Sequence, residues 1–152
     1  MGVMQVSRKV DYALRAAIYL ATQDLKKTCS STGEIAEIQR IPKKFLEKII
    51  QDLVRSGLVK SKRGPDGGYS LARPSHEISF QDVIEAIEGP IALNVCLDSK
   101  GSCDLLSRCT MSGVWQEVQH KVVDVFARTT LADVKMIPCH ACSPFSSFSS
   151  AA

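Results

Sequence analysis

The stretch RIPKKFLEKIIQDLVRSG, residues 40–57, carries the repeat of apolar and charged side chains that is typical of an amphipathic helix. Pro42 suits the first turn, where its missing N–H costs nothing, and Gly57 is a common helix stop. We therefore predict a helix with one buried face and one charged outer side. The apolar residues of the buried face are Phe45, Leu46, Ile49, Ile50, Leu53 and Val54.

Two further helices are predicted upstream of this stretch. Apolar residues recur at helical spacing over residues 6–21. Ser31 with Glu34 three residues later forms a capping-box pattern, which predicts a short helix over residues 31–39. Only the brief Arg40-Ile41 connection separates this helix from the next, as a helix-turn-helix requires.

A β-hairpin is predicted downstream. Residues 58–62 and 69–72 have the composition of two strands, and the sequence GPDGG at residues 64–68 supplies a turn between them. Three helices followed by a two-stranded hairpin is the element order of a winged helix-turn-helix. The predicted fold class is therefore mainly α with a small β-hairpin.

The second half of the chain has a different organisation. Ser79 with Asp82 predicts the start of a short capped helix, after which the chain becomes loop-like and rich in cysteine. We expect a winged DNA-binding domain over residues 1–76 and a dimerisation helix over residues 110–136. Between them lies a short helix with a cysteine loop, residues 77–109, and residues 137–152 are expected to form a disordered tail.

A long helix is predicted over about residues 110–129, and it carries a heptad seam. Its apolar positions are separated by steps of 4, 3, 4, 3 and 4, which is the spacing of a coiled-coil contact. Pairing with a second copy would give a two-fold homodimer that presents two recognition helices to half-sites about 34 Å apart, or a multiple of that. The alternative is that the seam packs on the chain's own core. The seam consists of Met111, Trp115, Val118, Val122, Val125 and Thr129.

Composition narrows the class of protein. The 152 residues are 45% hydrophobic and 23% charged, which is ordinary for one globular domain. No run of 18 apolar residues occurs, so no membrane span is predicted. Charges interrupt the apolar pattern of the first 20 residues, which excludes a secretory signal there and favours a cytoplasmic protein.

The charge distribution indicates a polyanion-binding module in the first half. Residues 1–76 hold 14 Lys and Arg against 7 Asp and Glu, a balance of +7, whereas residues 77–152 hold 5 against 9, a balance of −4. The predicted third helix and hairpin carry basic residues where a winged helix faces double-stranded DNA. An outer face that is merely solvated, or a protein-docking module, is the alternative. The candidate DNA-binding residues are Lys43, Lys44, Glu47, Lys48, Lys60, Lys62 and Arg63.

Three of the six cysteines cluster in the predicted loop. Cys96, Cys103 and Cys109 are spaced C-x6-C-x5-C, wider than the C-x2-4-C pairs that usually bind zinc. Wide spacing in a glycine-containing loop suits thiolate ligands of an iron–sulfur cluster. Incidental thiols are the alternative. The separate pair Cys139 and Cys142 could bind a metal or act as a dithiol, but the preferred interpretation is that it has no such role.

These features together resemble a known family. The motif Asp11-Tyr12-Ala13-Leu14-Arg15, the wing RGPDGGY at residues 63–69 and three cysteines before a Trp-containing long helix resemble the iron–sulfur-dependent winged-helix regulators, the family of IscR, NsrR and RirA. The resemblance covers about residues 4–135. It implies a homodimeric transcription regulator, usually a repressor, whose cluster alters its affinity for an operator, and it favours control of cluster-biogenesis genes.

The resemblance also implies roles for particular residues. The three clustered cysteines match the cluster ligands, Glu47 and Lys48 match positions that touch bases, and Arg63 matches a minor-groove residue of the wing. The spacing differs from the commonest one, which has five residues between each pair. Ser112 stands where a branch with a [2Fe–2S] cluster has a histidine ligand. Asp11 matches an aspartate that the partner subunit supplies to a [4Fe–4S] cluster in another branch, so either residue is a candidate fourth ligand.

Other functions are weaker predictions. The sequence shows no nucleophile–base pair, no phosphate-binding loop and no paired acids, which argues against an enzyme. A nitric oxide- or iron-responsive repressor of the same family is one alternative. A regulator without a cluster that depends on thiols or zinc is another.

Overall fold

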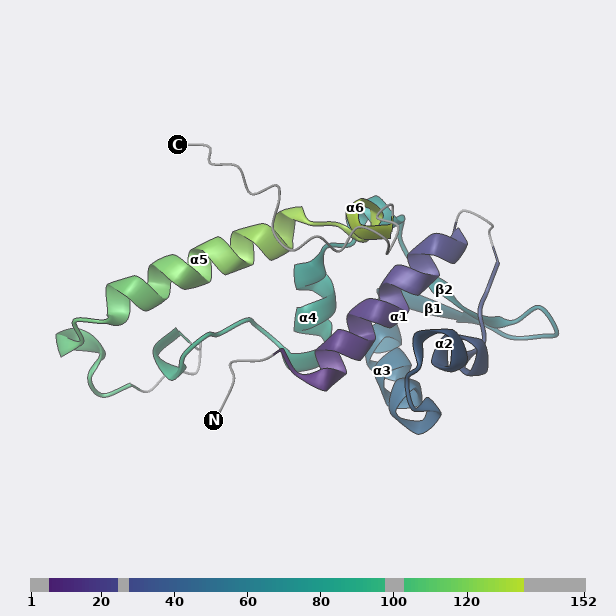
Figure 1. The fold of residues 1–152 in the computed structure, drawn as a ribbon, viewed down its shortest axis with the longest axis horizontal. Helices are drawn as coiled ribbons and strands as arrows, with labels where there is room; N and C mark the ends of the chain where they lie inside the picture. Colours follow the sequence, from purple (N-terminus) through teal and green to yellow (C-terminus); the bar gives the residue numbers. More distant parts are fainter. Residues whose placement is uncertain (1–5, 25–27, 98–102, 136–152) are drawn as a thin grey trace.

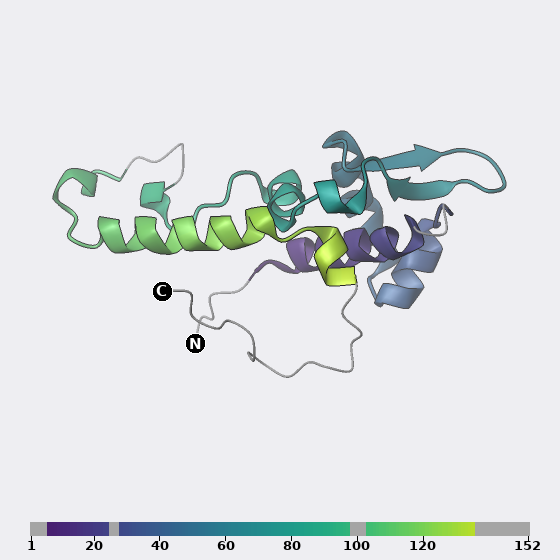
Figure 2. The same ribbon diagram turned by 90° about the horizontal axis from the view of Figure 1, so that it is seen from above.

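The computed structural model describes residues 6–24, 28–97 and 103–135. Its chain forms two regions, which we call the head and the arm (Figure 1). The head contains the first four helices, the hairpin and the last short helix, whereas the arm is a single long helix, α5, with the cysteine-containing segment beside it (Figure 2). No helix in the described part of the chain is long and apolar enough to cross a bilayer.

Three helices of the head form the predicted helix-turn-helix. They are α1 (Arg8–Asp24), α2 (Thr32–Gln39) and α3 (Lys43–Arg55), and each packs against the other two. The predicted buried face of α3 is confirmed at four positions: Leu46, Ile49, Ile50 and Leu53 are 0–1% exposed. Phe45 is 41% exposed because it lies at the flank of that face. The third helix is thus held on one side only, and its charged side is free.

The start and end of α2 follow local chemistry. The Ser31 hydroxyl accepts a hydrogen bond from the backbone N–H of Glu34 at 3.2 Å, as predicted. The reciprocal half of the capping box is replaced, because the Glu34 carboxylate accepts a hydrogen bond from the Tyr19 hydroxyl at 2.7 Å. The helix ends at Arg40, whose φ of 52° is left-handed, a conformation that costs a residue with a Cβ atom about 1–2 kcal/mol.

The wing is an antiparallel hairpin of β1 (Val59–Lys62) and β2 (Gly68–Leu71). Ser30, in the connection between α1 and α2, forms an isolated antiparallel bridge with Tyr69 of β2, with N···O distances of 3.0 and 2.8 Å. Gly68 has a φ of 145°, and a Cβ atom there would lie 2.7 Å from the carbonyl oxygen of Ser30. The glycine of the wing motif is therefore required by this close approach of two backbones.

The helix α4 (Phe80–Glu88) closes the head against α1 and α3, after the short 3-10 helix η1 (Ser75–Glu77). Its predicted capping box is complete. The Asp82 backbone N–H donates to the Ser79 hydroxyl at 3.1 Å, and the Ser79 N–H donates to the Asp82 carboxylate at 2.9 Å.

The long helix has close to the predicted extent, because the sequence places it over about residues 110–129 and α5 covers Ser112–Arg128. Thr129 is extended, and a separate short helix, α6 (Leu131–Lys135), follows after Thr130. The reason is packing: Leu131 is fully buried in the head, and its N–H donates to the carbonyl of Ile78 at 2.9 Å. The end of the predicted dimerisation helix thus returns to the head.

The cysteine segment, described at residues 91–97 and 103–111, contains two short 3-10 helices. They are η2 (Val95–Leu97) and η3 (Leu106–Arg108). The side-chain oxygen of Gln119 on α5 accepts a hydrogen bond from the Leu93 N–H at 3.0 Å, which holds the start of this segment against the arm. The predicted tail, residues 137–152 with Cys139 and Cys142, lies outside the described residues.

Candidate nucleic-acid interface and cysteine segment

The outer side of α3 is exposed as predicted. None of its charged side chains forms an ion pair with another residue in the described ranges, whereas Asp52 on the flank pairs with Lys9 and Arg55. Lysines without a carboxylate partner are available to neutralise phosphates, and a glutamate can accept a hydrogen bond from a cytosine N4. The exposed residues of this side are Lys43, Lys44, Glu47, Lys48 and Gln51.

The start of α3 adds a second feature that favours an anion. Pro42 gives no side-chain cap, so the first N–H groups of the helix, those of Lys43 and Lys44, have no side-chain acceptor. The partial positive charge of a helix N-terminus attracts phosphate, and the two lysines lie at the same end. The first turn of α3 therefore combines helix dipole and side-chain charge.

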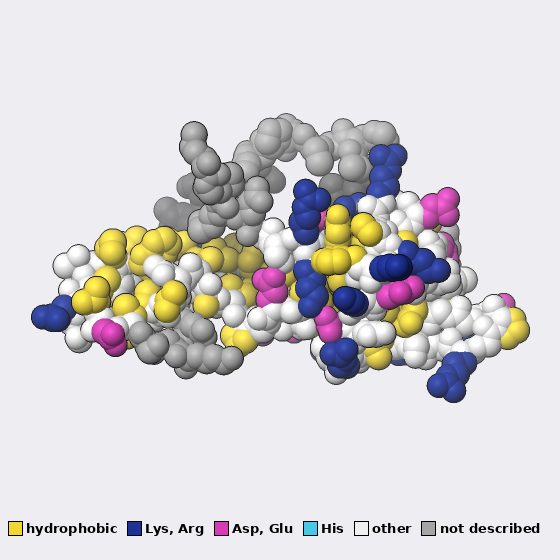
Figure 3. Space-filling view, turned by 90° about the horizontal axis from the view of Figure 1, so that it is seen from below, with side chains coloured by type: hydrophobic (Ala, Val, Ile, Leu, Met, Phe, Trp, Pro, Cys, Tyr) yellow, Lys and Arg dark blue, Asp and Glu magenta, His cyan; other side chains and the backbone are white. Residues whose placement is uncertain are grey.

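The wing places its basic residues at a narrow tip. Lys60, Lys62 and Arg63 are all exposed, and the turn that follows is tight. A Cβ atom on Gly67 would lie 2.5 Å from the carbonyl oxygen of Lys62, so the backbone closes without room for a side chain. Figure 3 shows Lys and Arg side chains gathered over the winged half of one face, with hydrophobic side chains over the half that contains the arm.

The three clustered cysteines lie along the arm. Cys96 is within η2, and Cys109 follows η3; both thiols and that of Cys103 are free and half-buried. Among the described residues, no three His, Cys, Asp or Glu side chains are close enough together to hold a metal ion. The structure therefore places the cysteines on one segment without assembling them into a ligand set.

The two candidate fourth ligands have other partners. The Ser112 hydroxyl donates a hydrogen bond to the backbone carbonyl of Cys109 at 2.9 Å, at the start of α5. Asp11 lies in the first turn of α1, where its carboxylate is 3.7 Å from the Arg15 guanidinium and 57% exposed. Ser112 is thus adjacent to the third cysteine, whereas Asp11 belongs to the head.

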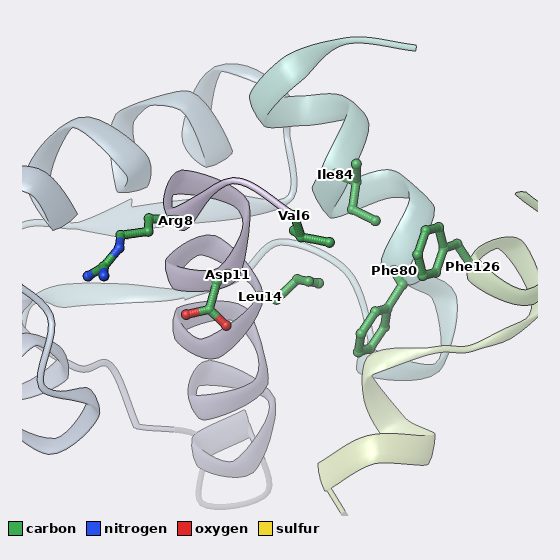
Figure 4. A pocket seen from close by; sticks show the side chains of 7 residues that line it. All are labelled: Val6, Arg8, Asp11, Leu14, Phe80, Ile84 and Phe126. Atoms are coloured by element: carbon green, nitrogen blue, oxygen red, sulfur yellow. The ribbon is translucent and has the colours of Figure 1, made fainter. Parts of the chain in front are cut away.

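An apolar cavity of about 460 Å³ lies where the head meets the arm. Figure 4 shows apolar side chains of α1, α4 and α5 converging on it, while the charged ends of Arg8 and Asp11 point away. Arg8 and Asp11 also line the cavity, so it is mostly but not wholly apolar. Its apolar lining consists of Val6, Leu14, Phe80, Ile84 and Phe126.

A contact that sequence reasoning missed joins α1 to the turn of the helix-turn-helix. Arg15 Nη2 donates a hydrogen bond to the carbonyl oxygen of Gln39, and its guanidinium carbon lies 5.7 Å from the centre of the Tyr12 ring. The Tyr12 ring in turn packs edge-on against Phe45 of α3, with centroids 5.8 Å apart. The spacing Tyr12-x-x-Arg15 was the only signal in the sequence, because the partner residues are more than twenty positions away.

The fold, the exposed basic helix and the basic wing define a winged helix-turn-helix transcription regulator. The chain belongs to the Rrf2 family, described as "Iron-dependent Transcriptional regulator", which matches residues 6–136. The predicted resemblance and fold class are thereby confirmed. Members of this family bind DNA and are not enzymes.

Individual relatives agree with this assignment. The chain is 40% identical over 132 residues to the HTH-type transcriptional regulator Rv1287 of Mycobacterium tuberculosis, covering 86% of this chain and 81% of the relative. It is similar to CymR, the global cysteine regulator of B. subtilis, with a TM-score of 0.73, 29% identity and coverage of 88% and 97%. It is also similar to T. potens IscR, with a TM-score of 0.70, 32% identity and coverage of 86% and 85%.

Proposed function

We propose that this chain is a homodimeric repressor whose affinity for an operator in double-stranded DNA is switched by an iron–sulfur cluster, and that it controls genes of cluster biogenesis. The observation that carries this proposal is the position of three free, half-buried thiols on the arm, beside the helix that would join two heads. The iron-dependent description of the family and the likeness to an IscR structure support it.

The donor chemistry fits such a cluster. Thiolates are the usual ligands of [2Fe–2S] and [4Fe–4S] clusters, and Cys96, Cys103 and Cys109 would supply three of them. Ser112 or Asp11 of a second subunit would complete the set. When bound, the cluster supplies sensitivity to oxidants, nitric oxide or iron supply. The chain's own contribution is to hold the cysteine segment against α5 through the Leu93–Gln119 hydrogen bond.

A second copy would cover the apolar side of α5. No residue of this helix is buried, and two residues of the seam, Met111 at its start and Val118, are 62% and 39% exposed. Exposed apolar residues at heptad spacing are typical of a helix that pairs with its own copy. The half-buried Trp115 and Val122 lie on the same seam. This supports the homodimer over packing on the chain's own core.

Each head would read DNA with α3 and the wing. Glu47 and Lys48 would touch base edges in the major groove, while Lys43 and Lys44 contact phosphates. Arg63 would enter a narrow minor groove, which attracts arginine by its negative potential. These roles use side chains that are exposed and without ion-pair partners in the described structure.

A cluster-free regulator that depends on thiols or zinc is a second candidate. Within the described ranges the cysteines form no group that could hold a metal ion, which favours its thiol-dependent form over a zinc-dependent one. The likeness to a structure named as a global cysteine regulator also supports a regulator that uses its thiols. A nitric oxide- or iron-responsive repressor would use the same three thiols and differ only in the signal.

Anaerobic purification tests these alternatives. We expect broad visible absorption and bound iron in the wild-type chain, and loss of both in Cys96→Ala. Cys29→Ala is the matched control, because Cys29 is also free and half-buried but lies in the head. A colourless, iron-free protein after reconstitution would exclude the cluster, and zinc bound in its place would favour the second candidate.

Mössbauer spectra of Asp11→Ala and Ser112→Ala would identify the fourth ligand and the type of cluster. A spectrum that changes in one variant assigns that residue, whereas an unchanged spectrum removes it from the ligand set. A gel-shift titration of anaerobic and cluster-free protein on DNA upstream of cluster-biogenesis genes then tests the switch. Equal affinities of the two forms would contradict it.

A further inference from the structure

Arg15 makes contacts with three groups on the side of the head that carries the turn. Its Nη2 donates to the carbonyl oxygen of Gln39, the last residue of α2, and its guanidinium lies over the Tyr12 ring. Its Nη1 is 3.7 Å from the Asp11 carboxylate. A planar guanidinium with donors on several edges suits this combination of hydrogen bond and stacking, which a lysine cannot reproduce in full.

The turn at the end of α2 needs a contact from outside the helix, and the Gln39 carbonyl accepts one. Arg40 follows it in a left-handed conformation, with its N–H donating back to the carbonyls at the end of α2. The N–H of Ile41 donates to the carbonyl of Ala36 at 2.9 Å, which completes the turn. Because Arg40 has a Cβ atom, this conformation is disfavoured unless surrounding contacts hold it. The Arg15 hydrogen bond is such a contact.

The same cluster reaches the first turn of α3. Tyr12 packs edge-on against Phe45, which directly follows Lys43 and Lys44. An edge-to-face aromatic pair fixes relative orientation as well as distance. The contacts of Arg15 and Tyr12 therefore hold the end of α2 and the beginning of α3 to one face of α1.

We propose that Arg15 is the positioning residue for sequence reading by α3: it fixes the turn at Gln39 and, through Tyr12 and Phe45, the angle at which α3 meets DNA. This inference rests on the proposed role of α3 in contacting bases. Base contacts require a defined side-chain geometry, whereas contacts of exposed lysines with phosphates tolerate small rotations. Loss of Arg15 should therefore weaken sequence selection more than binding to DNA in general.

Binding measurements with two duplexes test this role. The first probe is the duplex that the wild-type chain selects from a random-sequence library, and the second is a scrambled duplex of the same length. For Arg15→Gln we expect affinity for the selected duplex to fall about tenfold, with affinity for the scrambled duplex within about twofold of wild type. For Arg15→Lys we expect an affinity for the selected duplex between those of Arg15→Gln and the wild type, because lysine retains a donor for the Gln39 carbonyl.

Arg128→Gln is the matched control. Arg128 also pairs with an aspartate four residues earlier, Asp124, at 3.5 Å, but it lies on the arm. This variant should bind both duplexes as the wild type does. Equal losses on both duplexes in Arg15→Gln would indicate a simple charge effect and would overturn the proposal, as would unchanged selectivity.

Amide hydrogen exchange tests, in the absence of DNA, whether Arg15 holds the turn after α2. We expect the N–H groups of Arg40 and Ile41 to exchange faster in Arg15→Gln than in the wild type, with the core amides of α1 unchanged. Unchanged exchange at both positions would overturn the proposal, and so would global unfolding of both Arg15 variants, which would assign Arg15 to stability. A wild-type chain that selects no sequence would instead refute the proposed DNA reading itself, and the inference with it.

Discussion

The head and the arm bury their apolar residues in different ways. Elements of the head pack on one another, so that residues from α1, α2, α3 and α6 reach 0–1% exposure in one core. The arm has no buried residue on α5, although that helix carries an apolar seam. Apolar burial stabilises by about 25 cal/mol per Å². The head can therefore be stable by itself, whereas the arm has apolar surface that a second copy would cover.

The largest expected effect is a loss of stability when a buried residue of the head is replaced, compared with an exposed residue of the arm. Leu46→Ala removes a fully buried side chain from the head and should lower the free energy of unfolding by about 2–5 kcal/mol. Val118→Ala, on the arm, should change it by less than about 0.5 kcal/mol when the chain is dilute enough to be monomeric. Urea denaturation followed by circular dichroism measures both.

Protein concentration sharpens this test. If a second copy covers the arm, the midpoint of unfolding should rise with concentration in the wild type and rise less in Val118→Ala. Equal losses in Leu46→Ala and Val118→Ala at every concentration would contradict the distinction, because Val118 would then be packed against its own chain.

A pair of glycine substitutions should have opposite signs in the two regions. Gly68→Ala in the wing forces a Cβ atom against the Ser30 backbone at a positive φ, and should cost about 2–3 kcal/mol of stability. Gly113→Ala lies in α5, where a Cβ atom would meet nothing outside the helix itself within 4 Å, and should stabilise that helix by about 0.5 kcal/mol. Thermal unfolding measures both. A tolerated Gly68→Ala would mean that Ser30 does not pair with the wing.

The sequence predicted the head well because its signals are local. Pro42 and Gly57 bracket α3, Ser79 with Asp82 starts α4, and the glycine turn marks the wing, each from chemistry within a few residues. The return of the chain to the head after Thr129 was not predictable in this way. It depends on Leu131 packing into a core formed by residues fifty or more positions earlier.

The candidate site also has one part that the sequence predicted and one that it did not. Exposure of Lys44 and Lys48 follows from the helical pattern of α3, so the predicted DNA-facing side is exposed as expected. The arrangement of the three thiols was not predictable, because it depends on how the cysteine segment lies on α5. The contact between Arg15 and Gln39 was also invisible, since a carbonyl oxygen has no signature in a sequence.

A smaller effect concerns the turn in the head. Arg40→Gly removes a Cβ atom from a left-handed residue and should raise the free energy of unfolding by about 0.5–1 kcal/mol. Glu37→Gly is the control within α2, where the same change should destabilise the helix by about 1 kcal/mol. Urea denaturation at neutral pH distinguishes the signs. A loss of stability in Arg40→Gly would mean that the arginine side chain contributes more than its backbone conformation costs.

The smallest effect is a difference in pH dependence. Burial, with a hydrogen bond to Glu34, raises the pKa of Tyr19 in the head above its ordinary value of 10.0. The stability that this tyrosine contributes is therefore fully present below about pH 10 and is lost as the pH rises through its raised pKa in the folded chain.

The arm has the opposite dependence. A hydrogen bond from Lys121 lowers the pKa of Glu117, so its contribution is present above the ordinary pKa of 4.5 and is lost as the pH falls through the lowered value. This pair is exposed, and its effect should be close to the limit of measurement. The test is urea unfolding of the wild type, Tyr19→Phe and Glu117→Gln from pH 3 to 11. Tyr19→Phe should lose part of the fall in stability at alkaline pH, whereas Glu117→Gln should leave that fall unchanged. An alkaline decline that persists in full in Tyr19→Phe would mean that other groups of the head, rather than this buried hydroxyl, set the upper pH limit of the fold.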